Sequence, residues 1–125
     1  MNDVGTRVIG AAIEVHKALG PGLLESAYEA AFVLELQDAG FVVSQQVPIA
    51  LEYKGRTLDI GFRADLVIEQ KVLVELKSVE EIREVHKKQV QTYLKLTGLR
   101  LGYLMNFNSR VMREGIVRCV NQFPE

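Results

Sequence analysis

The stretch of sequence that decides the fold is residues 61–77, GFRADLVIEQKVLVELK, which contains two short apolar runs. Runs such as residues 66–68 and 72–74 are typical of buried β-strands. Charged side chains are rarely buried in such strands unless they are paired or bind a metal. Asp65, Glu75 and Lys77 nevertheless lie in or beside these runs. We therefore expect the functional site to lie in this stretch.

The length of the loop between the two runs decides whether Asp65 and Glu75 meet. Side chains alternate along a strand, so Glu75 and Lys77 share one face. A two-residue loop would send Asp65 to the opposite face from Glu75. A three-residue loop, residues 69–71, would place Asp65 directly across from Glu75. Like charges at a Cβ separation of ~5 Å are destabilising unless something bridges them, and a divalent cation is the usual bridge.

The composition suits one globular domain that spans residues 1–125. The chain is 48% hydrophobic and 25% charged, which is enough to build one core with few appendages. It has no apolar run of the ~20 residues that a membrane span needs, and its N-terminus has no signal-peptide pattern. A single cysteine, Cys119, excludes an internal disulfide. We therefore expect a reducing, cytoplasmic location, with Cys119 as a small buried hydrophobe.

The charge of the chain is unevenly distributed along the sequence. The net charge of −1 argues against tight, nonspecific binding of nucleic acid. Residues 1–75 carry 6 basic and 11 acidic side chains, whereas residues 76–113 carry 8 basic and 3 acidic side chains. This asymmetry is compatible with a basic face beside an acidic metal site. Two ordinary solvated surfaces explain the charges equally well.

Apolar spacing and turn signals predict elements in the order α-α-β-β-β-α-β-β, which is an α/β domain with a mixed sheet flanked by helices. The predicted helices cover residues 3–19, 23–39 and 78–97. The predicted strands cover residues 47–53, 56–68, 72–77, 99–107 and 114–120. Ser78 and Glu81 form a capping-box pattern at the start of the third helix. Pro48 predicts that the first strand lies at an edge of the sheet, and alternation places Phe62, Ala64 and Leu66 on one face of the second strand.

Several other polar residues allow two interpretations. Glu25 lies in the first turn of a predicted helix, where a carboxylate complements the helix dipole without any further role. Gln89 is an amide on the predicted buried face of its helix, where a structural hydrogen bond to the backbone would suffice. Asp59 lies about 20 Å from Asp65 along an extended strand, so we exclude it as a partner. His16 is more readily explained as a packing residue than as a base.

Three motifs of the chain resemble those of one enzyme superfamily. Asp65 followed on the next strand by Glu75-Leu76-Lys77 resembles the PD-(D/E)xK motif of the nuclease superfamily of that name. Residues 22–28, GLLESAY, resemble the signature of the GxxExxY family within that superfamily. Residues 89–93, QVQTY, resemble the Q-x-x-x-Y helix motif of its exonuclease-like branch. The motifs follow the family's order and the resemblance covers nearly the whole chain, although Ala64 stands where the superfamily often has proline.

This resemblance implies a restriction-endonuclease-like fold and a Mg²⁺-dependent phosphodiesterase site that also accepts Mn²⁺. Asp65 and Glu75 would hold the metal, because hard oxygen ligands suit Mg²⁺. Lys77 would lower the pKa of the attacking water or stabilise charge on the phosphate. Glu25 would reach the site as a further metal ligand or as a group that positions water.

The resemblance also implies a nucleic-acid partner, and we expect DNA. Gln89 and Tyr93 would orient the site or the nucleic-acid backbone. The basic residues that would contact phosphates are Arg83, Lys87, Lys88 and Lys95, although a solvated helix face explains them too. The chain has nothing outside its core to grip a duplex, so we expect a homodimer or a partner protein to supply that surface. The alternative function is a non-cleaving nucleic-acid-binding or protein-interaction module that retains the fold; the buried charges favour the enzyme, because without a role they would cost several kcal/mol.

Overall fold

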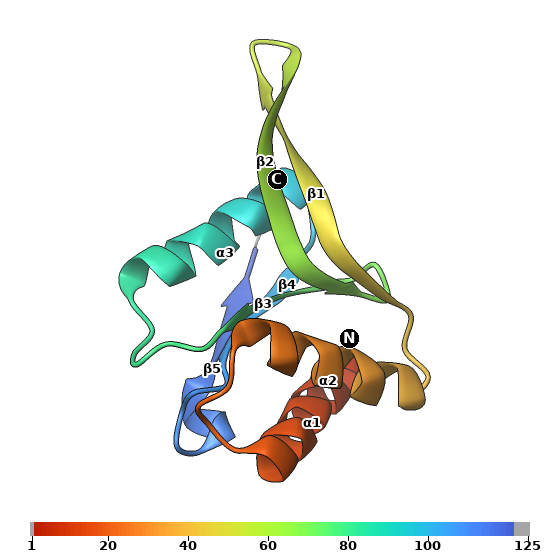
Figure 1. Ribbon diagram of the computed structural model, residues 1–125. Helices are drawn as coiled ribbons and strands as arrows, with labels where there is room; N and C mark the ends of the chain where they lie inside the picture. The colour runs from red at the N-terminus through yellow and green to blue at the C-terminus, as the bar shows by residue number, and fades with distance from the viewer. Residues whose placement is uncertain (1, 122–125) are drawn as a thin grey trace.

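The computed structural model describes residues 2–121, which form a five-stranded mixed sheet with helices on both faces (Figure 1). The strands lie in the order β1-β2-β3-β4-β5, with β3 and β4 parallel and the other neighbours antiparallel. The elements are α1 (Asn2–Leu19), α2 (Glu25–Asp38), β1 (Val43–Tyr53), β2 (Arg56–Ile68), β3 (Val72–Lys77), α3 (Glu84–Thr97), β4 (Leu101–Asn106), the 3-10 turn η1 (Met112–Gly115) and β5 (Ile116–Val120). The predicted α/β class and order of helices and strands are confirmed. No helix within residues 2–121 is long and apolar enough to cross a membrane.

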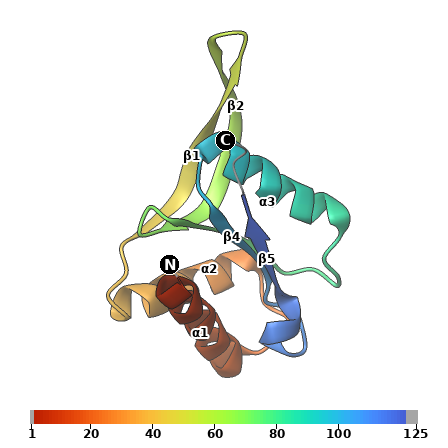
Figure 2. The ribbon, with the colours of Figure 1, turned by 180° about the vertical axis from the view of Figure 1, so that it is seen from behind.

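Two hydrophobic cores lie on opposite faces of the sheet. Val72, Val74 and Leu76 of β3 pack in the core that α1 and α2 cover. Leu73 packs in the core that α3 covers. Figures 1 and 2 show α1 and α2 together on one side of the sheet and α3 on the other. The alternation predicted for β3 is therefore confirmed, and it directs Glu75 and Lys77 toward the α3 side.

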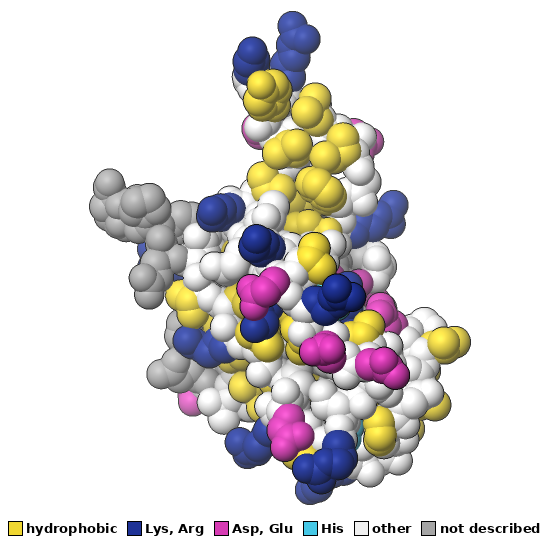
Figure 3. All heavy atoms as spheres, turned by 90° about the vertical axis from the view of Figure 1, so that its left-hand side faces the viewer, with side chains coloured by type: hydrophobic (Ala, Val, Ile, Leu, Met, Phe, Trp, Pro, Cys, Tyr) yellow, Lys and Arg dark blue, Asp and Glu magenta, His cyan; other side chains and the backbone are white. Residues whose placement is uncertain are grey.

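The strands β1 and β2 are longer than their neighbours and extend past the body of the protein as a two-stranded arm (Figure 1). Gly55, with a φ of 75°, closes the turn at its tip. Apolar side chains follow one face of this arm, and basic side chains lie at its end (Figure 3). Tyr53 and Ile60 on the arm are 60% and 51% exposed. As Pro48 predicted, β1 is an edge strand.

The N-cap of the third helix is Arg83, five residues later than the sequence predicts. The hydroxyl of Ser78 donates to the carbonyl of Leu23 over 2.6 Å and is not a helix cap. Helix α3 begins at Glu84, where the backbone N–H of Arg83 donates to Nδ1 of His86 over 2.9 Å. The predicted capping box is therefore wrong, because the Ser78 side chain ties the end of β3 to the loop before α2.

Strict alternation along β2 fails at the point where Asp65 lies. Ala64 packs in the α3-side core, whereas Leu66 packs in the core beneath α1 and α2. The prediction that these two side chains share a face is therefore wrong. The change of side coincides with an irregularity in the neighbouring strand, since the β1–β2 pairing passes over Gln46, whose φ is 50°.

Candidate active site

The turn between β2 and β3 brings the two predicted carboxylates together. It contains three residues, 69–71, because Ile68 pairs with Val72. The first two residues of this turn both have a φ of 55°, which closes it tightly. Continuing the register from this pair places Asp65 opposite Glu75. Of the two loop lengths that the sequence allowed, the structure has the one that joins the carboxylates.

The carboxylates of Asp65 and Glu75 occupy a gap where β2 and β3 diverge. The backbone pairing of these strands ends at Leu66 and Val74. Beyond it, the N–H of Leu76 donates to Oδ2 of Asp65 over 2.8 Å. The N–H of Asp65 donates a longer bond of 3.4 Å to Oε2 of Glu75. Side-chain oxygens thus replace backbone carbonyls as acceptors at this end of the sheet.

Glu75 is buried beside another acid, which strongly favours its neutral form. Its side chain is 4% exposed. The pKa of Glu75 is raised to about 9, first by burial and then by the charge of Asp65 and a hydrogen bond to it, while the charge of Lys77 opposes the shift. Bound protons and bound cations both relieve the repulsion of such a pair. Two adjacent hard oxygen donors therefore fit Mg²⁺ or Mn²⁺, and Mg²⁺ commonly takes one or two carboxylates and fills its other positions with water and phosphate.

Lys77 lies on the same face of β3 as Glu75, two residues further along the strand. Its side chain is half-buried, and it is close enough for its charge to lower the pKa of Glu75. Within residues 2–121, no ion pair or hydrogen bond engages its ammonium group. The amine therefore lies beside the carboxyl pair and is available to a bound ligand.

Helix α3 contributes the Gln89–Tyr93 pair to the same region. The amide of Gln89 donates to the hydroxyl of Tyr93 over 3.0 Å. Gln89 is exposed, so the prediction of a buried amide bonded to the backbone is wrong. Tyr93 is buried, and its pKa is raised first by burial and then by the charges of Glu75 and Asp65, while the bond from Gln89 acts in the opposite direction. These effects place its hydroxyl within electrostatic reach of the carboxyl pair.

The structure does not bring Glu25 into a metal-binding group with Asp65 and Glu75. Glu25 is the exposed first residue of α2. Among residues 2–121, no group of three or more His, Cys, Asp or Glu side chains is arranged to hold a metal. The loop before α2 does lie at the end of β3, since Ser78 donates to the carbonyl of Leu23. A role for Glu25 in the site therefore stays a prediction.

Two residues that sequence reasoning did not assign to the site contact Asp65 directly or through one intermediate. The amide of Gln46 donates to Oδ1 of Asp65 over 3.3 Å and to both carboxylate oxygens of Glu29 over 3.2 Å. Gln45 also donates to Glu29, over 3.1 Å. Glu29 lies one helical turn after Glu25, and that spacing was the only signal in the sequence. Nothing in the sequence singled out Gln46.

A groove beside Tyr93 is lined by one of the predicted phosphate-binding lysines, Lys88, and not by its neighbour Lys87. It has a volume of about 360 Å³ and is lined by Phe62, Val85, His86, Lys88, Gln89, Thr92 and Tyr93. Lys88 therefore lines the same groove as Gln89 and Tyr93. Lys87 instead pairs with Glu84 over 3.4 Å. Arg83 and Lys95 are exposed and line neither this groove nor the cavity described next.

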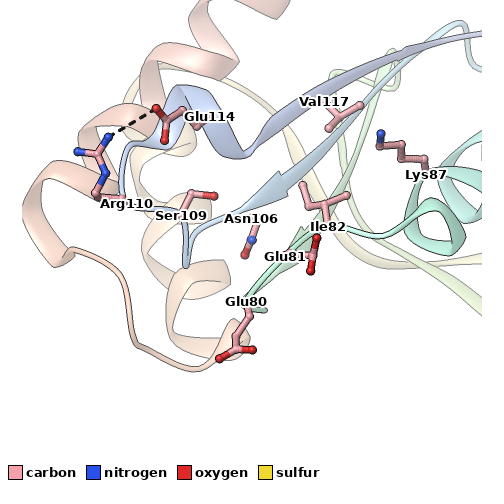
Figure 4. A pocket seen from close by; sticks show the side chains of 9 residues that line it. All are labelled: Glu80, Glu81, Ile82, Lys87, Asn106, Ser109, Arg110, Glu114 and Val117. Carbon is pink, nitrogen blue, oxygen red and sulfur yellow. Dashed lines mark ion pairs between the residues drawn. The ribbon is translucent and has the colours of Figure 1, made fainter.

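Lys87 lines a second cavity, of about 460 Å³, that contains none of the residues of the carboxyl pair (Figure 4). Its walls mix acidic and basic side chains, including an ion pair of 3.7 Å between Arg110 and Glu114. The cavity lies between the connection that precedes α3 and the segment that precedes β5 (Figure 4). Lys87 and Lys88, although adjacent in sequence, therefore line different cavities.

Comparison with known protein families identifies the family of this chain. A family model described as the PD-(D/E)XK nuclease superfamily matches residues 2–119. No curated protein and no solved structure matches the chain. Nucleases of this superfamily generally use divalent metal ions, which agrees with the paired carboxylates. Because the match spans nearly the whole sequence and the observed fold is restriction-endonuclease-like, this chain belongs to the PD-(D/E)XK nuclease superfamily.

Proposed function

We propose that this protein is a metal-dependent nuclease that hydrolyses phosphodiester bonds in DNA, and that it belongs to the GxxExxY family. The observation that supports this most strongly is the apposition of Asp65 and Glu75 in a gap of the sheet, with Lys77 beside them. A buried acid beside a second, half-buried acid destabilises a fold unless a cation or a proton neutralises the pair. A catalytic metal site would explain why the chain keeps this destabilising arrangement, because a bound cation neutralises the carboxyl pair.

Asp65 and Glu75 would hold Mg²⁺, for which Mn²⁺ could substitute. When bound, such an ion would supply positive charge that stabilises the phosphate and lowers the pKa of the attacking water. Glu25, at the exposed start of α2, would act through water rather than as a direct third ligand. The absence of a three-acid cluster among residues 2–121 supports that distinction.

The remaining site residues would act on the substrate and on the attacking water. The Lys77 ammonium donates hydrogen bonds to the water oxygen or to a non-bridging phosphate oxygen, and so stabilises developing negative charge. The water oxygen forms a bond to phosphorus as the bond to the leaving sugar oxygen breaks, which gives a phosphate monoester and a hydroxyl. Gln89 and Tyr93 would orient the nucleic-acid backbone at the groove beside α3.

Two further features bear on the cellular compartment of the protein and on its oligomeric state. The only cysteine, Cys119, is free and buried, which supports a reducing cytoplasmic compartment. Of the predicted basic residues, Lys87 and Lys88 line different cavities, and Arg83 and Lys95 line neither. Either a second copy of this chain or a partner protein would then complete the grip on a duplex.

The first test compares the response of three proteins to metal. Mn²⁺ or Mg²⁺ should raise the melting temperature of the wild type but not that of Asp65→Ala. Asp59→Ala is the matched control, because Asp59 is an exposed aspartate of the same strand, and it should respond like the wild type. Equal responses of all three proteins would contradict the metal site.

The second test is cleavage of single-stranded, duplex and branched DNA in the presence of Mg²⁺ or Mn²⁺. Products should form with the wild type and with Lys71→Ala, whose lysine is exposed in the β2–β3 turn. They should be absent with Lys77→Ala. Binding of DNA without any products from the wild type would instead support the non-cleaving module.

A further inference from the structure

Gln46 combines an unfavourable backbone conformation with a specific set of hydrogen bonds. Its φ of 50° lies in the left-handed region, which residues with a side chain rarely adopt and which is enriched at functional sites. The pairing of β1 with β2 includes Gln45 with Leu66 and Val47 with Ala64 but passes over Gln46. Asp65 lies between those two partners on β2. Gln46 and Asp65, which face each other in this register, therefore lack the regular backbone pairing of the residues on either side.

At this position the side chain of Gln46, and not its backbone, bonds to Asp65. Its Nε2 atom donates to Oδ1 of Asp65 over 3.3 Å and to the carboxylate of Glu29 over 3.2 Å. Ionised carboxylates only accept hydrogen bonds, so the NH₂ group, and not the carbonyl oxygen, must lie between the two acids. The two hydrogens of the amide thereby serve one acid from β2 and one from α2.

Both oxygens of Asp65 are therefore held by groups outside its own strand. Oδ2 accepts the backbone N–H of Leu76 over 2.8 Å, and Oδ1 accepts the amide of Gln46. Two bonds from opposite neighbours restrict rotation of the carboxylate about its side-chain torsions. Glu29 in turn restricts the Gln46 amide, and Gln45 adds a second bond to Glu29.

We propose that Gln46 is a positioning residue for Asp65, and that Glu29 acts through Gln46 to fix the direction in which Asp65 presents its carboxylate. This inference rests on the proposed function, because the direction of Asp65 matters only if that residue binds a metal. Partners of metal ligands commonly change metal affinity by 10–100-fold when they are mutated. Gln46 lies outside the motifs that carry the superfamily resemblance.

The decisive variant is Gln46→Gly. Glycine adopts a φ of 50° without strain, so the melting temperature measured with a chelator should not fall. The apparent affinity for Mn²⁺, measured by titration calorimetry, should nevertheless weaken by about tenfold or more. Gln70→Gly is the matched control, because Gln70 is an exposed glutamine of the β2–β3 turn with a φ of 55° and lies outside the Gln46 network, and its affinity should stay within about twofold of the wild type.

A second measurement reads the position of Asp65 without any metal. The N–H of Leu76 is bonded to Asp65, so its hydrogen-exchange rate reports how firmly that carboxylate is held. Exchange at Leu76 should accelerate several-fold in Gln46→Gly and not in Gln70→Gly. Glu29→Ala should produce a smaller acceleration that does not add to that of Gln46→Gly, because both changes act on one network.

Different experimental results would overturn the positioning role of Gln46 and the proposed nuclease function. Wild-type Mn²⁺ affinity and wild-type exchange at Leu76 in Gln46→Gly would overturn the positioning role and leave the nuclease proposal intact. A lower melting temperature of Gln46→Gly in chelator would also overturn it, since that result indicates a structural role. A wild type that does not respond to Mn²⁺ would refute the proposed function and, with it, the significance of positioning Asp65.

Discussion

The backbone N–H of Leu76 donates to Oδ2 of Asp65 over 2.8 Å, so β3 is bonded to a side chain of β2 where it would otherwise meet a backbone carbonyl. The two strands diverge at this point. The same divergence creates the space that the Asp65 and Glu75 carboxylates occupy. Fold and site are therefore coupled through one hydrogen bond, and substitutions of Asp65 should affect both.

Asp65→Asn and Asp65→Ala should differ in stability in the absence of metal. Asparagine keeps an oxygen that accepts the Leu76 N–H and removes the charge that faces Glu75, so Asp65→Asn should be at least as stable as the wild type. Alanine leaves a buried N–H without its acceptor, which costs about 1–3 kcal/mol. Urea denaturation with a chelator measures the difference. An Asp65→Asn protein that is less stable than Asp65→Ala would show that the hydrogen bond does not matter.

The raised pKa of Glu75 predicts how stability depends on pH. Its folded pKa of about 9 exceeds the ordinary carboxyl value of 4.5. The stability associated with the neutral form is therefore fully present below about pH 4.5 and is lost as the pH rises toward 9. Glu75→Gln imitates the neutral form at every pH. In chelator it should melt about 5 °C or more above the wild type near pH 8 and at the same temperature near pH 4.

Parallel melting curves of the wild type and Glu75→Gln across this range would contradict the shifted pKa. Glu81→Gln is a suitable control, because Glu81 is exposed and lies outside the carboxyl pair. Its melting temperature should follow that of the wild type at both values of pH.

Metal binding should release the proton that Glu75 holds. A metal ligand must be deprotonated, so the apparent affinity for Mn²⁺ should rise about tenfold for each unit of pH between about 6 and 8. Calorimetry in buffers of different ionisation enthalpy should show about one proton released per bound ion. An affinity that is independent of pH would mean that Glu75 is already ionised or is not a ligand.

The sequence predicts the structure correctly where a single local rule, such as strand alternation, decides the outcome. Alternation along β3 correctly assigned Val72 and Leu73 to opposite cores, and Pro48 correctly marked the edge strand. The loop between β2 and β3 stayed undecided, because both two-residue and three-residue turns suit its composition. Only the register of the folded strands shows that Asp65 meets Glu75.

The errors arose where contacts between distant segments outweighed local pattern. Ser78 has the sequence context of a helix cap but bonds to Leu23, 55 residues earlier. The helical spacing predicts that Gln89 lies on a buried stripe, yet the buried residues of its helix are Val90, Tyr93 and Leu94. The sequence around Gln46 does not predict a role for this residue. That role depends on a left-handed backbone conformation, which a glutamine rarely adopts and which no local pattern indicates here.

Lys88 should contribute to DNA binding and Lys87 should not. Lys88 lines the groove with Tyr93, whereas Lys87 pairs with Glu84. Each phosphate contact contributes about 0.9 to the slope of log affinity against log salt concentration. Lys88→Ala should therefore lower that slope by about 1, while Lys87→Ala leaves it unchanged. Fluorescence anisotropy of labelled DNA measures the affinity at several salt concentrations, with Ca²⁺ in place of Mg²⁺. Equal effects of the two variants would exclude the groove as the binding surface.

Tyr28, the last residue of the GLLESAY segment, should prove structural rather than catalytic. It is fully buried, its hydroxyl donates to the carbonyl of Gly20 over 2.5 Å, and it accepts the N–H of Leu23 over 3.0 Å. Its ring stacks on Phe107 at a centroid distance of 4.9 Å. Tyr28→Phe keeps the stacking and leaves two backbone groups without partners, which should cost about 1–3 kcal/mol.

The expected pattern is a lower melting temperature for Tyr28→Phe, by roughly 5 °C, with the affinity for Mn²⁺ retained below the transition. Tyr53→Phe is the control, since Tyr53 is 60% exposed, and it should melt like the wild type. Loss of metal binding in a folded Tyr28→Phe protein would contradict this assignment. It would show instead that the loop joining α1 to α2 holds Glu25 in the site, and that the whole segment, not only its carboxylate, serves the chemistry.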